Sequence, residues 1–275
     1  MTTSSARPST LPDGTGELVR TWPAAGEPWA VLVVVHGLGE HSGRYEPVAG
    51  PASAAGIEVL SFDLIGHGST GGRRADIDDW SRFLDQVQVH VEEARKSGLP
   101  VVLYGHSLGG LIALEYTLSE RPRPDLLVLS APALKGGAVW QRTIAPVLGR
   151  LAPTLAIPNA ITGEQLSRDP SVGDAYFGDP LVLTKATTRF GAGLFEAMDR
   201  TRAAIATLDV PTLVIHGGSD VLVQPDASLP LSGHPMVERR LYPKLRHECH
   251  NEPERSQVVG EVIEWIEGRL RGTAG

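Results

Sequence analysis

The feature that most constrains this chain is the ten-residue stretch Val101–Gly110, where an apolar run ends in Gly-His-Ser-Leu-Gly at positions 105–109. A helix-like stretch, Leu111–Ser119, follows directly. A strand, a tight turn and a helix in this order raise a serine above a sheet edge in strained backbone, and the flanking glycines relieve crowding against the neighbouring turns. The helix also directs its free N–H groups at the hydroxyl. We therefore predict that Ser107 is a nucleophile.

Buried strands alternate with amphipathic helices along the chain. The run Trp29–Val35 is continuous and β-branched, which is typical of a strand buried on both faces. Apolar residues from Trp80 to Ala94 recur at helical spacing and Gly98 is a stop signal, while a last helix is expected to begin near Pro253. Strands are expected at 17–22, 29–35, 57–63, 101–104, 126–130, 212–216 and 237–242. This alternation predicts an α/β fold with a mostly parallel sheet covered on both faces.

Two segments depart from this rhythm. Residues 134–208 are rich in Pro, Gly and Ala and have weak, Pro-interrupted helical patterns, so we predict an inserted cap there and a core made of residues 13–133 and 209–275. Within the cap, the apolar stretch 147–157 suits a tunnel wall, which we favour, and would equally suit peripheral contact with a membrane or lipid surface. Residues 1–12 are rich in Ser, Thr and Pro, and we expect a mobile N-terminal tail.

Composition restricts the partners and the compartment. The 275 residues suit one large domain or one domain with an insertion. A formal net charge of −7, with no basic block, argues against a nucleic-acid partner. The single cysteine, Cys249, allows no intramolecular disulfide and fits a reducing compartment. Residues 1–12 lack the apolar core of a signal peptide, and no apolar run reaches the roughly 20 residues that span a bilayer. We expect a cytoplasmic protein.

A catalytic serine needs a base and an acid. The hydroxyl is a poor nucleophile until an imidazole accepts its proton, and a carboxylate must orient that imidazole and stabilise its charged form. The α/β-hydrolase fold supplies these groups in the order Ser, Asp, His, from loops that follow late strands. Asp220 follows the expected strand 212–216, and His247 follows the expected strand 237–242. The order and the loop positions predict the triad Ser107, Asp220 and His247.

Each partner of the serine has rivals along the chain. Asp226 lies beyond Pro225, where a helix is expected to begin, and Asp209 precedes its strand and so lies at the wrong end. His234 likewise precedes the final strand. His250 lies three residues from His247, and spacing alone leaves both open.

An oxyanion hole is the second requirement of this chemistry. One donor should be the backbone N–H of Leu108, the residue after the nucleophile. The loop His-Gly-Leu-Gly at 36–39 follows an earlier strand, and we select the N–H of Leu38 as the second donor. Each donor should contribute about 3 kcal/mol in the transition state.

At this point the chain resembles the monoacylglycerol lipases of the α/β-hydrolase superfamily, within the serine aminopeptidase (S33)-type hydrolases. The resemblance rests on residues 36–45, 63–68, 105–110, 166–170, 179–182 and 247–252. It implies an α/β-hydrolase fold with a cap, the acid at Asp220 and the second oxyanion donor at Leu38. It also places the catalytic histidine first in His-Glu-x-x-Asn-Glu, which selects His247 over His250.

The same resemblance implies the reaction. We expect hydrolysis of fatty-acid esters, foremost monoacylglycerol to glycerol and fatty acid, without a metal or organic cofactor. The substrate would occupy a hydrophobic tunnel beneath the cap that has a polar end for glycerol. Alternatives are a lysophospholipase, a general carboxylesterase, a proline-type aminopeptidase or a non-catalytic binding protein.

Three further residues lie beside the expected site. Glu40 and Arg44 match charged positions near the family's active site, and because they are four residues apart they could pair with each other. Cys249 lies two residues past His247, so a bulky thiol reagent would block the site if the thiol is accessible and would not if it is buried.

Overall fold

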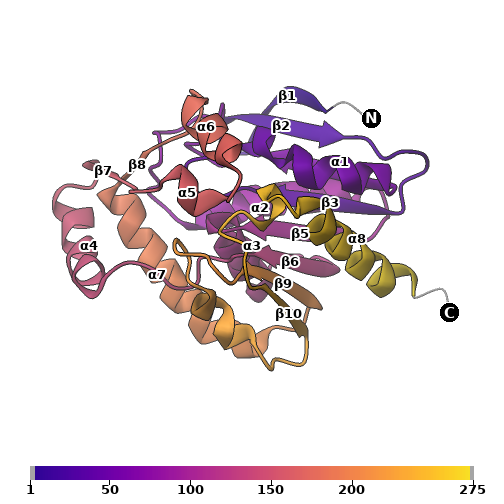
Figure 1. Cartoon of the computed structure of the whole chain (residues 1–275). Helices are drawn as coiled ribbons and strands as arrows, with labels where there is room; N and C mark the ends of the chain where they lie inside the picture. The colour runs from indigo at the N-terminus through magenta and orange to yellow at the C-terminus, as the bar shows by residue number, and fades with distance from the viewer. Residues whose placement is uncertain (1–3, 273–275) are drawn as a thin grey trace.

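A twisted eight-stranded sheet forms the centre of the computed structural model, which describes residues 4–272 (Figure 1). The strand order is β1-β2-β4-β3-β5-β6-β9-β10. β1 pairs with β2 and β2 with β4 in antiparallel fashion, and the remaining neighbours are parallel, as the sequence predicted. The strands are β1 (Ser5–Thr10), β2 (Gly16–Trp22), β3 (Ala30–Val35), β4 (Ile57–Phe62), β5 (Val101–His106), β6 (Leu126–Ser130), β9 (Thr212–Gly217) and β10 (Val237–Tyr242).

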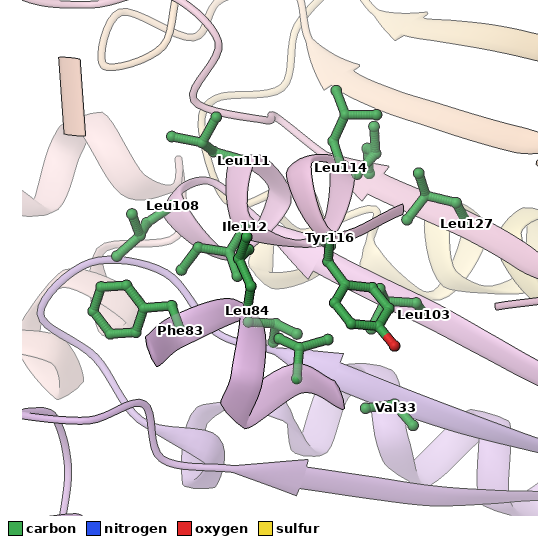
Figure 2. Close-up of a cluster of buried hydrophobic side chains, with 14 of the residues drawn as sticks. Val33, Phe83, Leu84, Leu103, Leu108, Leu111, Ile112, Leu114, Tyr116 and Leu127 are labelled. Carbon is green, nitrogen blue, oxygen red and sulfur yellow. The ribbon is translucent and has the colours of Figure 1, made fainter. Parts of the chain in front are cut away.

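Helices cover both faces of the sheet. Helices α1 (Glu46–Ala54) and α8 (Arg255–Arg271) pack on one face, whereas α2 (Ser81–Arg95) and α3 (Leu108–Leu118) pack on the other (Figure 1). Strand β3 shows why its apolar run is continuous. Val31, Val33 and Val35 belong to the core beneath α2 and α3, while alternate residues face the core beneath α1 and α8. Figure 2 shows the first of these cores, in which side chains of α2 and α3 meet those of β3, β5 and β6.

The structure corrects the expectation for the N-terminus. Residues 5–10 were expected in a mobile tail, but they form β1, which is paired with β2 along its full length. Polar Ser and Thr side chains suit this exposed edge strand, and Pro8 is tolerated because an edge strand has backbone positions that need no donor. The expectation for residues 1–3 lies outside the described residues. Helix α1 was not predicted, because Pro47 and Pro51 interrupt its pattern.

Residues 134–208, which we call the cap segment, lie beyond one end of the sheet and beside α3 (Figure 1). Its elements are α4 (Val139–Leu151), β7 (Ala156–Pro158), α5 (Gly163–Leu166), α6 (Pro170–Gly178), β8 (Lys185–Thr187) and α7 (Thr188–Ala204). β7 and β8 form a small antiparallel sheet, and α4 packs against α7. Helix α7 also contributes Phe190, Ala197 and Met198 to the core beneath α2 and α3, so the cap segment is anchored on the sheet domain. Within residues 4–272, no helix has the length and apolar character needed to cross a membrane.

Candidate active site

Ser107 stands at the turn between β5 and α3 with φ 53° and ψ −115°, a conformation that only a few non-glycine residues adopt. Crowding explains the glycines around it. A Cβ atom on Gly105 would lie 2.3 Å from the carbonyl oxygen of Gly109, and one on Gly109 would lie 2.1 Å from that of Val35. The backbone N–H of Ser107 donates to the carbonyl of Ser130 at 2.9 Å, which ties the strained turn to β6. The turn is therefore the strand-to-helix elbow that the sequence predicts.

Asp220 and His247 meet across the loops that follow β9 and β10. Nδ1 of His247 lies 2.7 Å from Oδ2 of Asp220 and donates to it, which leaves Nε2 as the proton acceptor. The second carboxylate oxygen of Asp220 accepts the backbone N–H groups of Leu222 and Val223 at 2.9 and 3.0 Å. Both side chains are almost fully buried. These contacts fix the direction of the carboxylate and, through it, of the imidazole.

The charges of this pair stabilise each other. Burial alone would raise the pKa of Asp220, but the imidazoles of His247 and His216 outweigh that effect and hold this pKa well below its usual range. Burial would lower the pKa of His247, but the carboxylate of Asp220 outweighs it and raises this pKa above its ordinary value. The pair thus provides a base whose protonated form is stabilised, as proton abstraction from a serine requires.

Ser107 and His247 line one cavity of about 400 Å³, together with Gly37, Leu38 and Leu108. In the described residues the backbone N–H groups of Leu38 and Leu108 have no acceptor from the protein, so both are available to a ligand. Most of the remaining lining is apolar and comes from the cap segment. The larger side chains that the cap segment contributes to the lining are Trp140, Ile144, Leu148, Ile157, Ile161, Leu166, Tyr176, Phe190, Leu194, Phe195 and Met198.

The rival residues lie elsewhere. Asp226 forms an exposed ion pair with Lys135, and Asp209 forms one with Arg123. His234 precedes β10, and its Nδ1 accepts the N–H of Met236 at 3.3 Å. His250 is buried without a hydrogen bond to the described protein, and its ring stacks on that of Tyr45. Neither His234 nor His250 contacts Asp220 through a hydrogen bond.

Comparison with known proteins identifies the family. The model of the serine aminopeptidase S33 family matches residues 26–254, which is most of the chain. The chain belongs to this family.

Relatives within the family share nearly the whole length. A monoacylglycerol lipase of Mycolicibacterium smegmatis is 36% identical over 261 residues, which cover 90% of this chain and 92% of the relative. A monoglyceride lipase of Homo sapiens is 33% identical over 276 residues, which cover 96% of this chain and 90% of the relative. The crystal structure of a Paleococcus ferrophilus monoacylglycerol lipase superposes with a TM-score of 0.84 at 28% identity, covering 92% of this chain and 99% of that one. This structure has the α/β-hydrolase fold, which confirms the fold class that the sequence predicts.

The sequence predicts only one of the two partners of Arg44, a residue beside this site. Arg44 pairs with Glu40, as their spacing suggested, but it also binds Glu248 through two bonds of 2.8 and 2.9 Å. Glu248 lies 204 positions away along the chain, so no local pattern reveals the contact. The available signal was its position directly after His247.

The question about Cys249 is answered by burial. The thiol is fully buried, and burial together with nearby carboxylates raises its pKa well above the usual value. A thiol that is both inaccessible and protonated reacts slowly. Of the two alternatives that the sequence leaves open, the structure therefore supports the buried, unreactive thiol.

Proposed function

We propose that this protein hydrolyses carboxylic esters of fatty acids, foremost monoacylglycerols, through an acyl-enzyme on Ser107. One observation carries the proposal: a strained serine and a buried Asp–His pair open onto a single cavity whose wall is mostly apolar. An acyl chain suits such a wall, because its burial removes apolar surface from water. The names of the M. smegmatis and human relatives support the choice of monoacylglycerols.

The proposed reaction has two halves. Nε2 of His247 accepts the proton of Ser107 as its oxygen attacks the ester carbonyl, and Asp220 stabilises the imidazolium. The N–H groups of Leu38 and Leu108 hold the oxyanion, and the alcohol leaves with the proton from His247. Water then gives a proton to His247 and attacks the acyl group, and the fatty acid leaves as Ser107 regains its proton.

The cap segment supports a further element of the proposal, contact with a lipid surface. None of the residues of α4 is buried, and its apolar side chains fall into two sets. Trp140 and Ile144 line the cavity, whereas Val139 and Leu151 are 83% and 80% exposed and lie outside its lining. Exposed apolar side chains on a helix that also lines the cavity suit a helix that rests on the lipid from which substrate is drawn.

A substrate profile of the purified full chain tests this function. We expect the highest kcat/KM on monoacylglycerols, set beside lysophospholipids, p-nitrophenyl esters of rising chain length and aminoacyl amides. Ser107→Ala should lower kcat roughly 10⁴-fold or more while the protein stays folded. Ser119→Ala, at the other end of the same helix, is the matched control and should retain wild-type activity.

Each contrary result points to a named alternative. Preference for lysophospholipids, short esters or amides would replace the substrate class and keep the mechanism. Retention of most activity by Ser107→Ala would refute the nucleophile. Failure of the wild-type chain to react with a fluorophosphonate probe would favour a binding protein without catalysis.

A further inference from the structure

A buried cluster of three charges lies at the wall of the cavity, and two of its members, Glu40 and Glu248, line that cavity. It consists of Glu40, Arg44 and Glu248, whose side chains are 3%, 11% and 2% exposed. Two carboxylates share one guanidinium, so the cluster carries a net charge of −1 beside a site where an oxyanion is proposed to form. Such a cluster is costly to bury, and the proposed reaction assigns it no role.

Glu40 contacts the loop that carries the proposed oxyanion donor. Its Oε1 accepts the backbone N–H of Gly37 at 2.5 Å and the hydroxyl of Tyr45 at 2.7 Å. Gly37 immediately precedes Leu38, and packing there is tight: a Cβ atom on Gly37 would lie 2.8 Å from Oε1 of Glu40. The carboxylate therefore fixes the peptide that enters the loop.

The next peptide is fixed from its other side. The ring of His36 donates from Nδ1 to the carbonyl of Gly37 at 2.8 Å, and its Nε2 accepts the N–H of Leu64 at 2.8 Å, which sets the tautomer. In a trans peptide the carbonyl and the following N–H point in opposite directions. Holding the Gly37 carbonyl against His36 therefore turns the N–H of Leu38 away from that ring.

Arg44 joins this loop to the loop of the catalytic base. Its guanidinium binds Oε2 of Glu40 and both oxygens of Glu248, which follows His247. Asn251 donates to Glu248 at 2.7 Å and fixes its orientation. The ring of Tyr176 from α6 lies over the guanidinium, with 4.7 Å from Cζ to the ring centroid, and covers it from the cap side.

The charge balance of the cluster favours the ionised forms. Burial alone would raise the pKa of Glu40, but Arg44 and neighbouring imidazoles outweigh burial and hold it below its usual range. Burial would lower the pKa of Arg44, but the two carboxylates raise it instead. Arg44 thereby neutralises a carboxylate that would otherwise repel the oxyanion.

We propose that Glu40 is a positioning residue of the reaction: it orients the loop that presents the Leu38 N–H, and Arg44 ties that loop to His247 through Glu248. This inference rests on the proposed function, because it assigns Leu38 as an oxyanion donor. It predicts that the reaction needs a side-chain oxygen at position 40 that accepts the N–H of Gly37, and that it does not need a negative charge there.

Two variants separate reach from charge. Glu40→Gln keeps an oxygen for the Gly37 N–H and loses the charge, whereas Glu40→Asp keeps the charge and withdraws it by one methylene. We expect kcat on monoacylglycerol to stay within about 5-fold of wild type in Glu40→Gln and to fall about 100-fold in Glu40→Asp, as when one oxyanion donor is misplaced. KM should change less than 3-fold in both.

The matched control is Glu17→Gln, another buried carboxylate. Glu17 is bonded to Gln86 and His90, and it does not line the cavity. We expect its kcat to remain within 2-fold of wild type even if its melting temperature falls. A general effect of removing a buried charge would appear in this control.

Arg44 is tested by a reversal. Arg44→Met should lower kcat about 100-fold, because the charge of Glu40 is then unopposed. Adding Glu40→Gln to that variant should restore kcat about 10-fold, since it removes the charge and keeps the acceptor. If kcat of the double variant is no higher than that of Arg44→Met, the neutralising role of Arg44 is overturned. If Arg44→Met does not fold, the comparison of Glu40→Gln with Glu40→Asp still decides the positioning role.

The outcomes separate this inference from the proposed function. If the wild-type protein did not hydrolyse esters, or if Ser107→Ala were fully active, the proposed function itself would be overturned. If those two behave as expected, then Glu40→Asp with kcat near wild type, or more active than Glu40→Gln, would overturn the positioning role alone. An increase in the KM of Glu40→Asp with kcat left near wild type would overturn it as well.

Discussion

The two walls of the cavity are built by different means. The wall of the sheet domain holds Ser107, Asp220 and His247 through backbone crowding, buried hydrogen bonds and paired charges. The wall of the cap segment presents α4, in which no residue is buried and apolar side chains face both the cavity and the exterior. Chemistry needs fixed distances between few atoms, whereas an acyl chain needs only apolar surface. We therefore expect substitutions in the first wall to act on kcat and those in the second to act on substrate capture.

After removal of the nucleophile itself, the largest expected effect is that of Asp220→Asn. An amide nitrogen in place of Oδ2 would donate to Nδ1 of His247, which puts the ring proton on Nε2 and removes the acceptor for Ser107. We expect kcat to fall on the order of 10³–10⁴-fold. Steady-state rates on a dispersed p-nitrophenyl ester would measure it. Asp209→Asn, an exposed rival, should remain within 2-fold of wild type.

The same variant has a signature in the pH profile. His247 must be neutral to accept a proton, so activity falls as pH drops through its pKa. The carboxylates of Asp220, Glu248 and Glu40 raise that pKa against the effect of burial. Removing the charge of Asp220 should lower it, and the acid limb of the residual kcat/KM should move to lower pH. A limb that moves to higher pH would contradict this assignment.

A smaller but still large effect is expected from Gly109→Ala. The new Cβ atom would lie 2.1 Å from the carbonyl oxygen of Val35, so β3 and the elbow must separate. We expect a loss of about 3 kcal/mol in the free energy of unfolding, measured by urea denaturation, together with lower kcat. Gly260→Ala is the control. Nothing lies within 4 Å of its Cβ position in α8, and alanine should stabilise that helix by up to about 1 kcal/mol.

The contrast between the two walls also decides how much the sequence reveals. The sheet is predicted from continuous β-branched runs such as Val31–Val35, because a strand that is buried on both faces has an apolar side chain at every position. The elbow is predicted because its steric demands select glycine at fixed positions. Asp220 follows from strand order, since the ends of parallel strands meet at one edge of the sheet. Strand order leaves both His247 and His250 open, and the resemblance to the family selects His247.

What the sequence misses depends on contacts between distant segments. The bond from Arg44 to Glu248 and the pairing of β1 with β2 have no local pattern, and the prolines of α1 hide a helix that tertiary packing stabilises. The cap segment is harder for a related reason. Its apolar side chains face both a cavity and the exterior. The single apolar stripe of a helix packed on a sheet is therefore missing from α4.

In the cap segment we expect substitutions to have a smaller effect on activity, and only when the substrate is presented in vesicles. Val139→Ser with Leu151→Ser removes two exposed apolar side chains that do not line the cavity. Activity on monoacylglycerol in phosphatidylcholine vesicles should fall roughly tenfold, because less apolar surface reaches the lipid, while hydrolysis of a dispersed short ester stays within 2-fold. Co-sedimentation with the vesicles gives the binding directly. Leu229→Ser, at an exposed site outside the cap segment, is the control, and equal losses on both substrates would contradict a docking role.

The smallest expected effect is that of a thiol reagent on the folded protein. Cys249 lies behind the sheet-domain wall, fully buried, with its pKa raised by burial and by nearby carboxylates. N-ethylmaleimide at neutral pH should therefore leave activity unchanged and label the chain only after denaturation, as mass spectrometry would show. In Val139→Cys, by contrast, the thiol introduced on the exposed face of α4 should react promptly under native conditions. Rapid native labelling of Cys249 would mean that the sheet-domain wall opens in solution, and the rigidity assigned to it here would then be lost.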